Sequence, residues 1–182
     1  MPMTVANILV TPTTDSRALT DLQHVFDRHF RQYSPSDLPA LADVLTTHCD
    51  LPVIKGLLAA LLNAPAQLDD IASRSYWHGN GFLKIVLLDQ GYKLRLHIWF
   101  AGQTCEENIH DHRWSFSSLI LAGALTSEMW KDDQSGQQFQ EYEYHAATPQ
   151  RAPYKLDLGL KHLSLDNVQI NTVGDHYVMP KG

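Results

Sequence analysis

The chain has 182 residues, 44% of them apolar and 19% charged, which predicts one globular domain with a full hydrophobic core rather than a disordered chain. The formal net charge of -6 predicts no broad basic surface, so nucleic acid is not an expected partner. No apolar run is as long as a membrane span, and the N-terminus lacks the pattern of a secretion signal. We therefore expect a cytoplasmic protein without a membrane partner. Cys49 and Cys105 are too few for a disulfide framework, and we expect reduced thiols.

Helical periodicity runs through about the first 75 residues. Ser16 is a candidate N-cap for a first helix, a second is expected to begin after Ser36, a third has Pro52 in its first turn, and a fourth covers residues 65–73. The apolar positions at helical spacing are Leu19, Leu22, Phe26, Phe30 and Tyr33 in the first helix and Ile54, Leu57, Leu58, Leu61 and Leu62 in the third. We interpret residues 1–78 as a helical region that packs on a sheet.

The histidines of this helical region have no second ligand three or four residues away. They are His24, His29 and His48. Scattered histidines in helices usually lie at the surface or at the edge of the core, so we expect a structural role.

The pattern changes from helical to extended at Gly79-Asn-Gly81. We predict strands at residues 82–88, 92–100, 109–121, 125–131, 139–145, 154–160, 168–173 and 176–179. Turn signals separate them at residues 89–91, 122–123, 132–136 and 152–153. Many short strands in succession predict an antiparallel sandwich or barrel over residues 79–182.

His110 and His112 are the residues most suggestive of chemistry. In a strand, residues i and i+2 point to the same face, so two imidazoles would lie side by side and could hold one divalent metal. The alternative is a pair of exposed strand histidines. A regular strand would add Trp114, Phe116 and Ser118 to the same face, as the walls of a small-molecule pocket or as ordinary core.

The segment from Gly102 to Gly123 resembles the first motif of the cupin superfamily: a glycine, a short loop, a His-x-His pair and a second glycine after a strand. The resemblance implies a mainly β fold, the cupin double-stranded β-helix or jelly-roll barrel, over residues 79–182 and preceded by the α-helical region of residues 1–78. The family's usual glutamate ligand, expected four residues after the second histidine, is Phe116 here. Its loss implies a three-histidine site, as in thiol dioxygenases of the cysteine dioxygenase type.

The order of elements over residues 82–125 is similar to that subgroup, but two features differ. The cysteine that forms a thioether crosslink in many of these enzymes would fall near Phe116 or Ser117, and neither can form it. The family's carboxylate-binding arginine has no clean match. Lys84 and Arg95 are candidates by position, and the alternative for each is a solvated strand charge.

The third histidine ligand is missing from the matching position. The second cupin motif runs glycine, five residues, proline, any residue, glycine, two residues and histidine, and the stretch from Gly174 matches it as far as Gly182. We expect the third ligand beyond Gly182, in a longer protein. The alternative is His162, with His145 and His176 as weaker candidates.

The resemblance implies a non-haem, metal-dependent cupin oxygenase, with Fe(II) held by three histidines, that combines dioxygen with a small molecule. A thiol oxidised to a sulfinate is one expected reaction. Nickel, zinc and copper also suit imidazole ligands. The alternatives are a cupin oxygenase for a non-thiol substrate and a non-catalytic, ligand-binding cupin. The resemblance also makes a homodimer an expected assembly, since cupins often dimerise.

Overall fold

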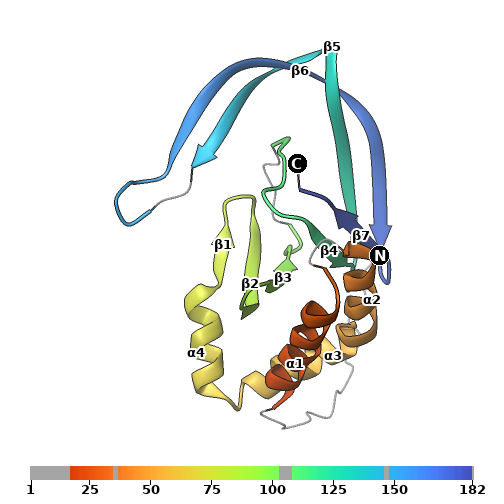
Figure 1. The fold of residues 1–182 in the computed structure, drawn as a ribbon, viewed down its shortest axis with the longest axis vertical. Coiled ribbons are helices and arrows are strands. Elements are labelled where there is room, and N and C mark those ends of the chain that lie inside the picture. The colour runs from red at the N-terminus through yellow and green to blue at the C-terminus, as the bar shows by residue number, and fades with distance from the viewer. Residues whose placement is uncertain (1–16, 35–36, 103–107, 146–147, 182) are drawn as a thin grey trace. The chain divides into compact units, whose positions relative to one another are not determined.

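The structure is a computed structural model, and it describes residues 17–34, 37–102, 108–145 and 148–181. The chain divides into two compact units. We call Met1–Ala122 together with Val173–Gly182 the helix-sheet unit, and Gly123–Thr172 the ribbon unit. In chain order the elements are α1 (Ala18–Gln32), α2 (Leu38–His48), α3 (Leu51–Leu61), α4 (Pro65–Arg74), β1 (Tyr76–His78), β2 (Phe82–Asp89), β3 (Lys93–Ile98), β4 (Phe116–Leu119), β5 (Ala124–His145), β6 (Tyr154–Thr172) and β7 (His176–Met179) (Figure 1).

The four predicted helices are confirmed, with small changes at their ends. Asp37 caps α2 by accepting a hydrogen bond from the Ala40 amide at 3.2 Å, and Asp50 caps α3 through the Val53 amide at 2.8 Å. Pro52 lies in the first turn of α3, where its missing N–H costs no helical hydrogen bond. The predicted cap Ser16 and the predicted start at Ser36 lie outside the described residues.

Two small antiparallel sheets complete the helix-sheet unit. One has the strand order β1-β2-β3 and the other pairs β4 with β7. Arg74 at the end of α4 donates hydrogen bonds from Nε to the Val86 carbonyl at 2.8 Å and from Nη2 to the Leu87 carbonyl at 2.7 Å. The register of β2 with β3 shifts at this point, so the arginine holds a bulged part of the strand against α4.

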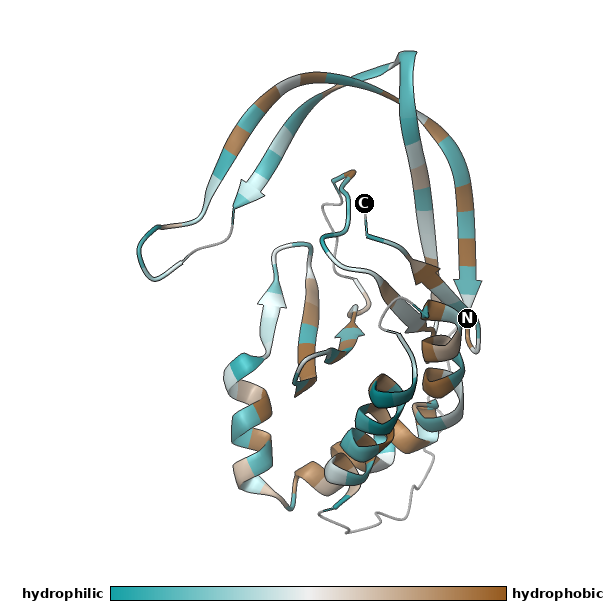
Figure 2. Ribbon diagram, in the orientation of Figure 1, coloured by the Kyte–Doolittle hydropathy of each residue, from teal (hydrophilic) through white to brown (hydrophobic). Residues whose placement is uncertain are grey.

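The hydrophobic core of the helix-sheet unit joins its helices to β2 and β3. Its buried members are Leu19, Leu22, Phe26, Leu45, Cys49, Ile54, Leu57, Leu61, Ile71, Leu87, Leu88 and Leu94. Figure 2 shows the matching pattern, with apolar faces on the helices and a strongly apolar β2. The apolar residues at helical spacing and the apolar run of β2 therefore pack together in one common core.

The ribbon unit consists of two long antiparallel strands, β5 and β6. Strand β5 runs through the turn predicted at residues 132–136, and β6 joins the two strands predicted at residues 154–160 and 168–173. Their register runs from the pair Ala124 and Thr172 to the pair His145 and Tyr154. The turn signal around Gly136 becomes a bulge, because the register shifts between Asp132 and Gln137. A Cβ on Gly136 would lie 2.4 Å from the Leu163 carbonyl oxygen, so the bulge requires glycine there.

The prediction of a mainly β jelly-roll barrel is wrong. Four helices precede separate antiparallel sheets of three, two and two strands, and no closed barrel forms within the described residues. The alternating pattern identified extended segments correctly but does not encode which segments pair. The strand predicted at residues 109–121 shortens to β4, and β1 was missed because three residues are too few to show a period. The domain boundary expected at residue 78 stays a prediction.

In the part of the chain that the structure describes, no single helix is long and apolar enough to cross a bilayer. The pair α2 and α3 passes the same test of length and composition only when the two helices are taken together, and they meet at a bend of 67°.

Candidate functional site

His110 and His112 lie close together, although not in a strand. Residues 108–115 form an irregular segment before β4, so the same-face geometry expected of a strand does not apply. The two imidazole rings nevertheless have centroids 4.9 Å apart and planes inclined by 77°. We call these two residues the histidine pair.

His110 is oriented by its own backbone segment. Its Nδ1 lies 2.7 Å from the Asn108 carbonyl oxygen. A carbonyl oxygen only accepts hydrogen bonds, so Nδ1 carries a proton, and in the neutral ring Nε2 keeps its lone pair. Metal-binding histidines are commonly oriented by such a bond from the second ring nitrogen. The exposed His110 ring is therefore ready to bind a metal through Nε2.

His112 is half-buried and meets the edge of the Phe116 ring, with centroids 4.9 Å apart and planes inclined by 86°. Phe116 in turn lies 6.1 Å from the Tyr177 ring of β7. Burial, and then the neighbouring His110, lower the pKa of His112, while Asp111 opposes the shift. A neutral imidazole is the form that binds metals, so this environment favours ligation at neutral pH.

Two further histidines, which the sequence reasoning missed, lie on β1 and β3. His78 stacks on Phe82 at 4.5 Å, and Phe82 lies 4.8 Å from the His97 ring. Burial, then Lys84 and His110, lower the pKa of His78. The Asn80 amide donates to Nδ1 of His78 at 3.2 Å, so Nε2 of this neutral ring carries a proton and acts as a donor.

His97 stays neutral over most of the pH range. Part of the residue remains exposed, yet burial of its imidazole against the Phe82 and Trp99 rings lowers its pKa to about 4, with further contributions from Lys84, Arg95 and His78. In the sequence, the spacing of two residues between Arg95 and His97 was the signal that both side chains lie on the same face of a strand.

The structure places both predicted anion-binding residues on this face of the β1-β2-β3 sheet. Lys84 pairs with Tyr76 on one side and His97 on the other, and its Nζ lies 5.4 Å and 5.5 Å from the centres of the Tyr76 and Phe82 rings. Arg95 shares the face with His97, two residues away. Among the described residues, no carboxylate forms an ion pair with Lys84 or Arg95.

The three predicted pocket walls are only partly brought together. Phe116 and Ser118 lie in β4, where Phe116 contacts His112 and Ser118 pairs with Tyr177. Trp114 lies outside the strand, is 62% exposed, and has the Arg113 guanidinium 5.4 Å from its ring centre. Of the predicted wall residues, Phe116 therefore contacts the histidine pair, whereas Trp114 is exposed outside the strand.

The third metal ligand is not found within the described residues, where no three His, Cys, Asp or Glu side chains are grouped to hold a metal ion. His162 lies on β6 of the ribbon unit, whereas the histidine pair belongs to the helix-sheet unit. The C-terminal segment that resembles the second cupin motif does lie beside the strand that follows His112. Met179 pairs with Phe116, and the Lys181 amide donates to Ser115 Oγ at 2.9 Å.

The residues present fit a transition metal only as a partial ligand set. Two imidazoles, one with its Nδ1 bonded to the Asn108 carbonyl, suit Fe, Ni, Zn or Cu better than Ca or Mg, which prefer oxygen ligands. Cys105 lies outside the described residues. No family model, no curated protein and no solved structure matches this chain, so the similarity to cupins has no support from these comparisons.

Proposed function

We propose that the histidine pair binds a transition metal, with Fe(II) as the favoured ion, and that the chain is a metal-dependent oxygenase of a small anionic molecule. The observation that supports this most is the geometry of the pair: two rings 4.9 Å apart, with Nδ1 of His110 bonded to the Asn108 carbonyl so that Nε2 is free. When bound, such a metal supplies open coordination positions at which a substrate and dioxygen meet.

The chain's own residues would then bind and orient the substrate. Lys84 and Arg95 offer two cations that form no close ion pair with a carboxylate among the described residues, and Lys84 lies beside a ring surface formed by Phe82 and Trp99. A small carboxylate with an apolar part matches this combination of charge and ring surface. The Nε2–H of His78 adds a neutral donor on the same sheet. A thiol acid oxidised to a sulfinate is one substrate of this class, and a thiol-free acid is the alternative.

A second candidate is a ligand-binding protein without turnover. It is favoured by the finding that only two imidazoles come together in the described part of the chain, which is fewer than the three protein ligands typical of a catalytic metal site. Both the oxygenase and the ligand-binding protein would use the anion-binding face with Lys84 and Arg95. Only the oxygenase would need to bind a metal ion tightly.

A metal titration distinguishes the metal-dependent oxygenase from the ligand-binding protein without turnover. Fe(II), added without oxygen, or Co(II) as a spectroscopic substitute should bind with a stoichiometry of about one per chain. His110→Ala and His112→Ala should each weaken binding by at least about 10–100-fold, the range seen when a partner of a metal ligand is removed. His24→Ala, which changes an exposed histidine of α1, is the matched control. Equal affinity in all four proteins would exclude the histidine pair as the site.

Oxygen uptake tests the reaction. The iron-loaded protein should be compared with cysteine, 3-mercaptopropionate and cysteamine, and with thiol-free acids of similar size. Cysteamine lacks the carboxylate, so it should react poorly if Lys84 and Arg95 orient the substrate, and Lys84→Met should raise the KM of the acids. No uptake with any thiol excludes the thiol reaction, while tight metal-free binding of the acids supports the second candidate. A homodimer stays a prediction, to be measured by light scattering.

A further inference from the structure

The histidine pair continues into a series of ring contacts that ends on β7. The centroids of the His110 and His112 rings are 4.9 Å apart, and those of His112 and Phe116 are also 4.9 Å apart. The Phe116 ring lies 6.1 Å from the ring of Tyr177 on β7. The ring planes are inclined by 77°, 86° and 81° along this series, so each contact is edge-to-face, an arrangement that neighbouring aromatic rings favour. We call these four residues the ring chain.

The two histidines of the ring chain are held in different ways. His110 is bonded through Nδ1 to the Asn108 carbonyl at 2.7 Å, which orients its ring within its own segment. The His112 ring is instead flanked by the rings of His110 and Phe116. Phe116 is the first residue of β4 and pairs with Met179 of β7. Because strand pairing fixes the Phe116 backbone, its ring can hold His112 in place from the side of the sheet.

A hydrogen bond also attaches the irregular segment to the end of the chain, but it does not orient an imidazole. The Lys181 amide donates this bond to Ser115 Oγ at 2.9 Å. It fixes the chain three residues beyond His112, and it leaves the side chain of His112 free to change rotamer. The Phe116 ring, in contrast, lies against the imidazole itself. Of these two contacts, the Phe116 ring is therefore the one that can determine how the His112 side chain is oriented.

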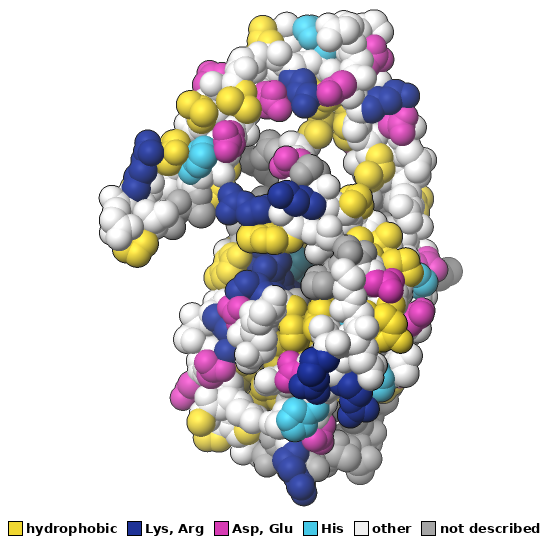
Figure 3. Space-filling model, in the orientation of Figure 1, with side chains coloured by type: hydrophobic (Ala, Val, Ile, Leu, Met, Phe, Trp, Pro, Cys, Tyr) yellow, Lys and Arg dark blue, Asp and Glu magenta, His cyan; other side chains and the backbone are white. Residues whose placement is uncertain are grey.

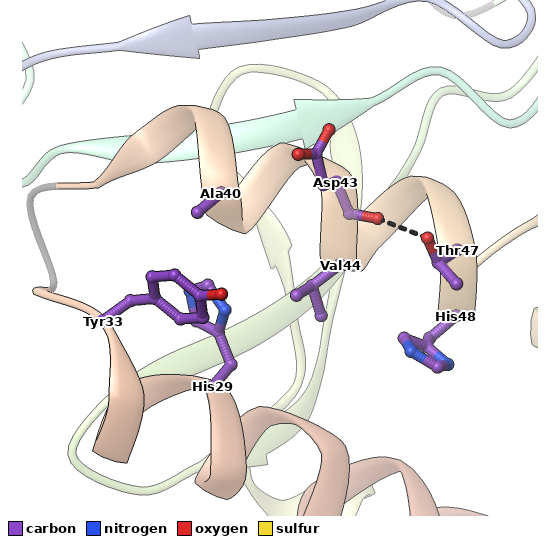
Figure 4. Close-up of a pocket in the computed structure, with 7 residues that line it drawn as sticks. All are labelled: His29, Tyr33, Ala40, Asp43, Val44, Thr47 and His48. Atoms are coloured by element: carbon purple, nitrogen blue, oxygen red, sulfur yellow. Dashed lines mark hydrogen bonds between the residues drawn. The ribbon is translucent and has the colours of Figure 1, made fainter.

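Two histidines of the helices provide references for a restrained and an open imidazole. His29 is 4% exposed, and its ring stacks on Tyr33 at 4.9 Å and meets the edge of Phe30 at 5.2 Å. His48, at the end of α2, is exposed, and Figure 4 shows its ring apart from those of His29 and Tyr33. The mobility of the His112 ring can therefore be measured against both references in the same molecule.

We propose that Phe116 is a positioning residue for the histidine pair. Its ring holds the His112 imidazole beside that of His110, and Tyr177 supports Phe116 from β7. The pair is then in place before a metal arrives, so less side-chain freedom is lost when the metal binds. The effect on metal binding rests on the proposed function, whereas the ring contacts themselves do not depend on a metal.

Ring dynamics in the metal-free protein test the contact directly. The full-length protein is labelled with ¹³C,¹⁵N-histidine, and NMR relaxation gives an order parameter for each ring. In the wild type the value for His112 should be close to that of His29 and above that of His48. Phe116→Leu keeps an apolar side chain without a ring and should lower the His112 value towards that of His48, while Phe116→Tyr restores the ring and should restore the order. An unchanged value in Phe116→Leu would overturn the proposal.

Variants of neighbouring residues separate positioning from general weakening of β4. Ser117→Ala changes the next residue of the strand and removes the hydrogen bond from Ser117 Oγ to the Leu38 carbonyl at 2.7 Å. It should leave the His112 ring as ordered as in the wild type, and an equal loss of order in Ser117→Ala and Phe116→Leu would contradict the proposal. If Phe116→Leu fails to fold, Tyr177→Leu and Tyr177→Phe decide. The leucine variant should loosen His112 and the phenylalanine variant should not, so equal values in the two contradict the ring chain.

Co(II) binding then tests the consequence for the metal site. Phe116→Leu should weaken the affinity by about 10–100-fold, the range for removing a partner of a metal ligand, and Phe116→Tyr should stay within about twofold of the wild type. Equal affinity in the wild type and Phe116→Leu would overturn the positioning role and leave the proposed metal site standing. If the wild type binds no Co(II), the proposed function fails, and the ring order of the metal-free proteins decides whether Phe116 positions His112.

Discussion

Strands β2 and β6 both carry rows of leucines, but only those of β2 are buried. Leu87 and Leu88 are 1% and 2% exposed, whereas Leu158 and Leu160 are 51% and 62% exposed. Strand β2 lies between two other strands and packs against α4, while among the described strands β6 pairs only with β5. Figure 3 shows apolar side chains at the surface of the ribbon unit among charged ones. Backbone pairing alone makes a strand, but a covering layer is needed to bury its side chains.

The largest expected effect comes from the matched substitutions Leu87→Ala and Leu160→Ala. The first removes a fully buried side chain and should cost about 2–5 kcal/mol of unfolding free energy. The second removes an exposed side chain and should change stability by less than about 0.5 kcal/mol. Urea unfolding measures both. A large loss for Leu160→Ala would mean that the leucines of β6 are covered in solution.

A smaller loss of unfolding free energy is expected when the hydrogen bonds between α4 and β2 are removed. Arg74→Met removes the two hydrogen bonds to the Val86 and Leu87 carbonyls and should cost about 1.5–3 kcal/mol, the range for hydrogen bonds from charged groups. Asp70→Asn breaks only the exposed ion pair with Arg74 and should cost less than about 1 kcal/mol. Equal losses in the two variants would show that the ion pair, rather than the carbonyl contacts, stabilises the bulge.

The N-terminal cap of α3 should contribute less to the unfolding free energy than the hydrogen bonds of Arg74. Asp50→Ala removes the bond to the Val53 amide and should lower the unfolding free energy by about 1 kcal/mol. Asp50→Asn keeps a capping oxygen and is the control, with a loss of only a few tenths expected. Thermal unfolding of the three proteins compares them. Identical melting of the alanine and asparagine variants would rule out a capping role.

The last expected effect is absent at neutral pH and is seen only as a change in how stability depends on pH. His97 has a pKa of about 4 in the folded chain and 6.5 as its ordinary value, so the unfolded chain binds its proton first as the pH falls. Its contribution to stability is present above about pH 6.5 and is lost between about pH 6.5 and 4. His97→Gln should flatten the stability curve in that window, in part only, because His78 and His112 also have lowered pKa values. If the dependence of stability on pH is the same in His97→Gln, the lowered pKa of His97 is contradicted.

Local patterns predicted the helices well because helix formation depends on neighbouring residues. Asp50 and Pro52 start α3 within one turn, and the apolar spacing of Leu19, Leu22 and Phe26 identified the buried face of α1. The predicted break around Gly136 failed for the opposite reason. Its glycine fits a turn, but pairing with β6 turns the same residues into a bulge in a continuous strand.

In the candidate site, too, local sequence patterns predicted one part and strand pairing decided the other. The spacing of His110 and His112 indicated a pair, and the two rings do meet, although a loop rather than a strand brings them together. His78 and His97 could not be linked to them by spacing. The antiparallel register of β1, β2 and β3 places His97 opposite Lys84 and His78 opposite Phe82, and only that register defines the face they share.

The sequence by itself therefore determined the four helices, the extended character of the C-terminal half and the histidine pair, because each depends on residues a few positions apart. Tertiary structure alone decided that the strands form separate sheets instead of a barrel, that leucines of β2 are buried while those of β6 are exposed, and that Nε2 of His29 has no hydrogen-bond partner among the described residues. Those outcomes depend on which segments pack together, and period-2 and period-3.6 patterns encode the face of an element but not its partner.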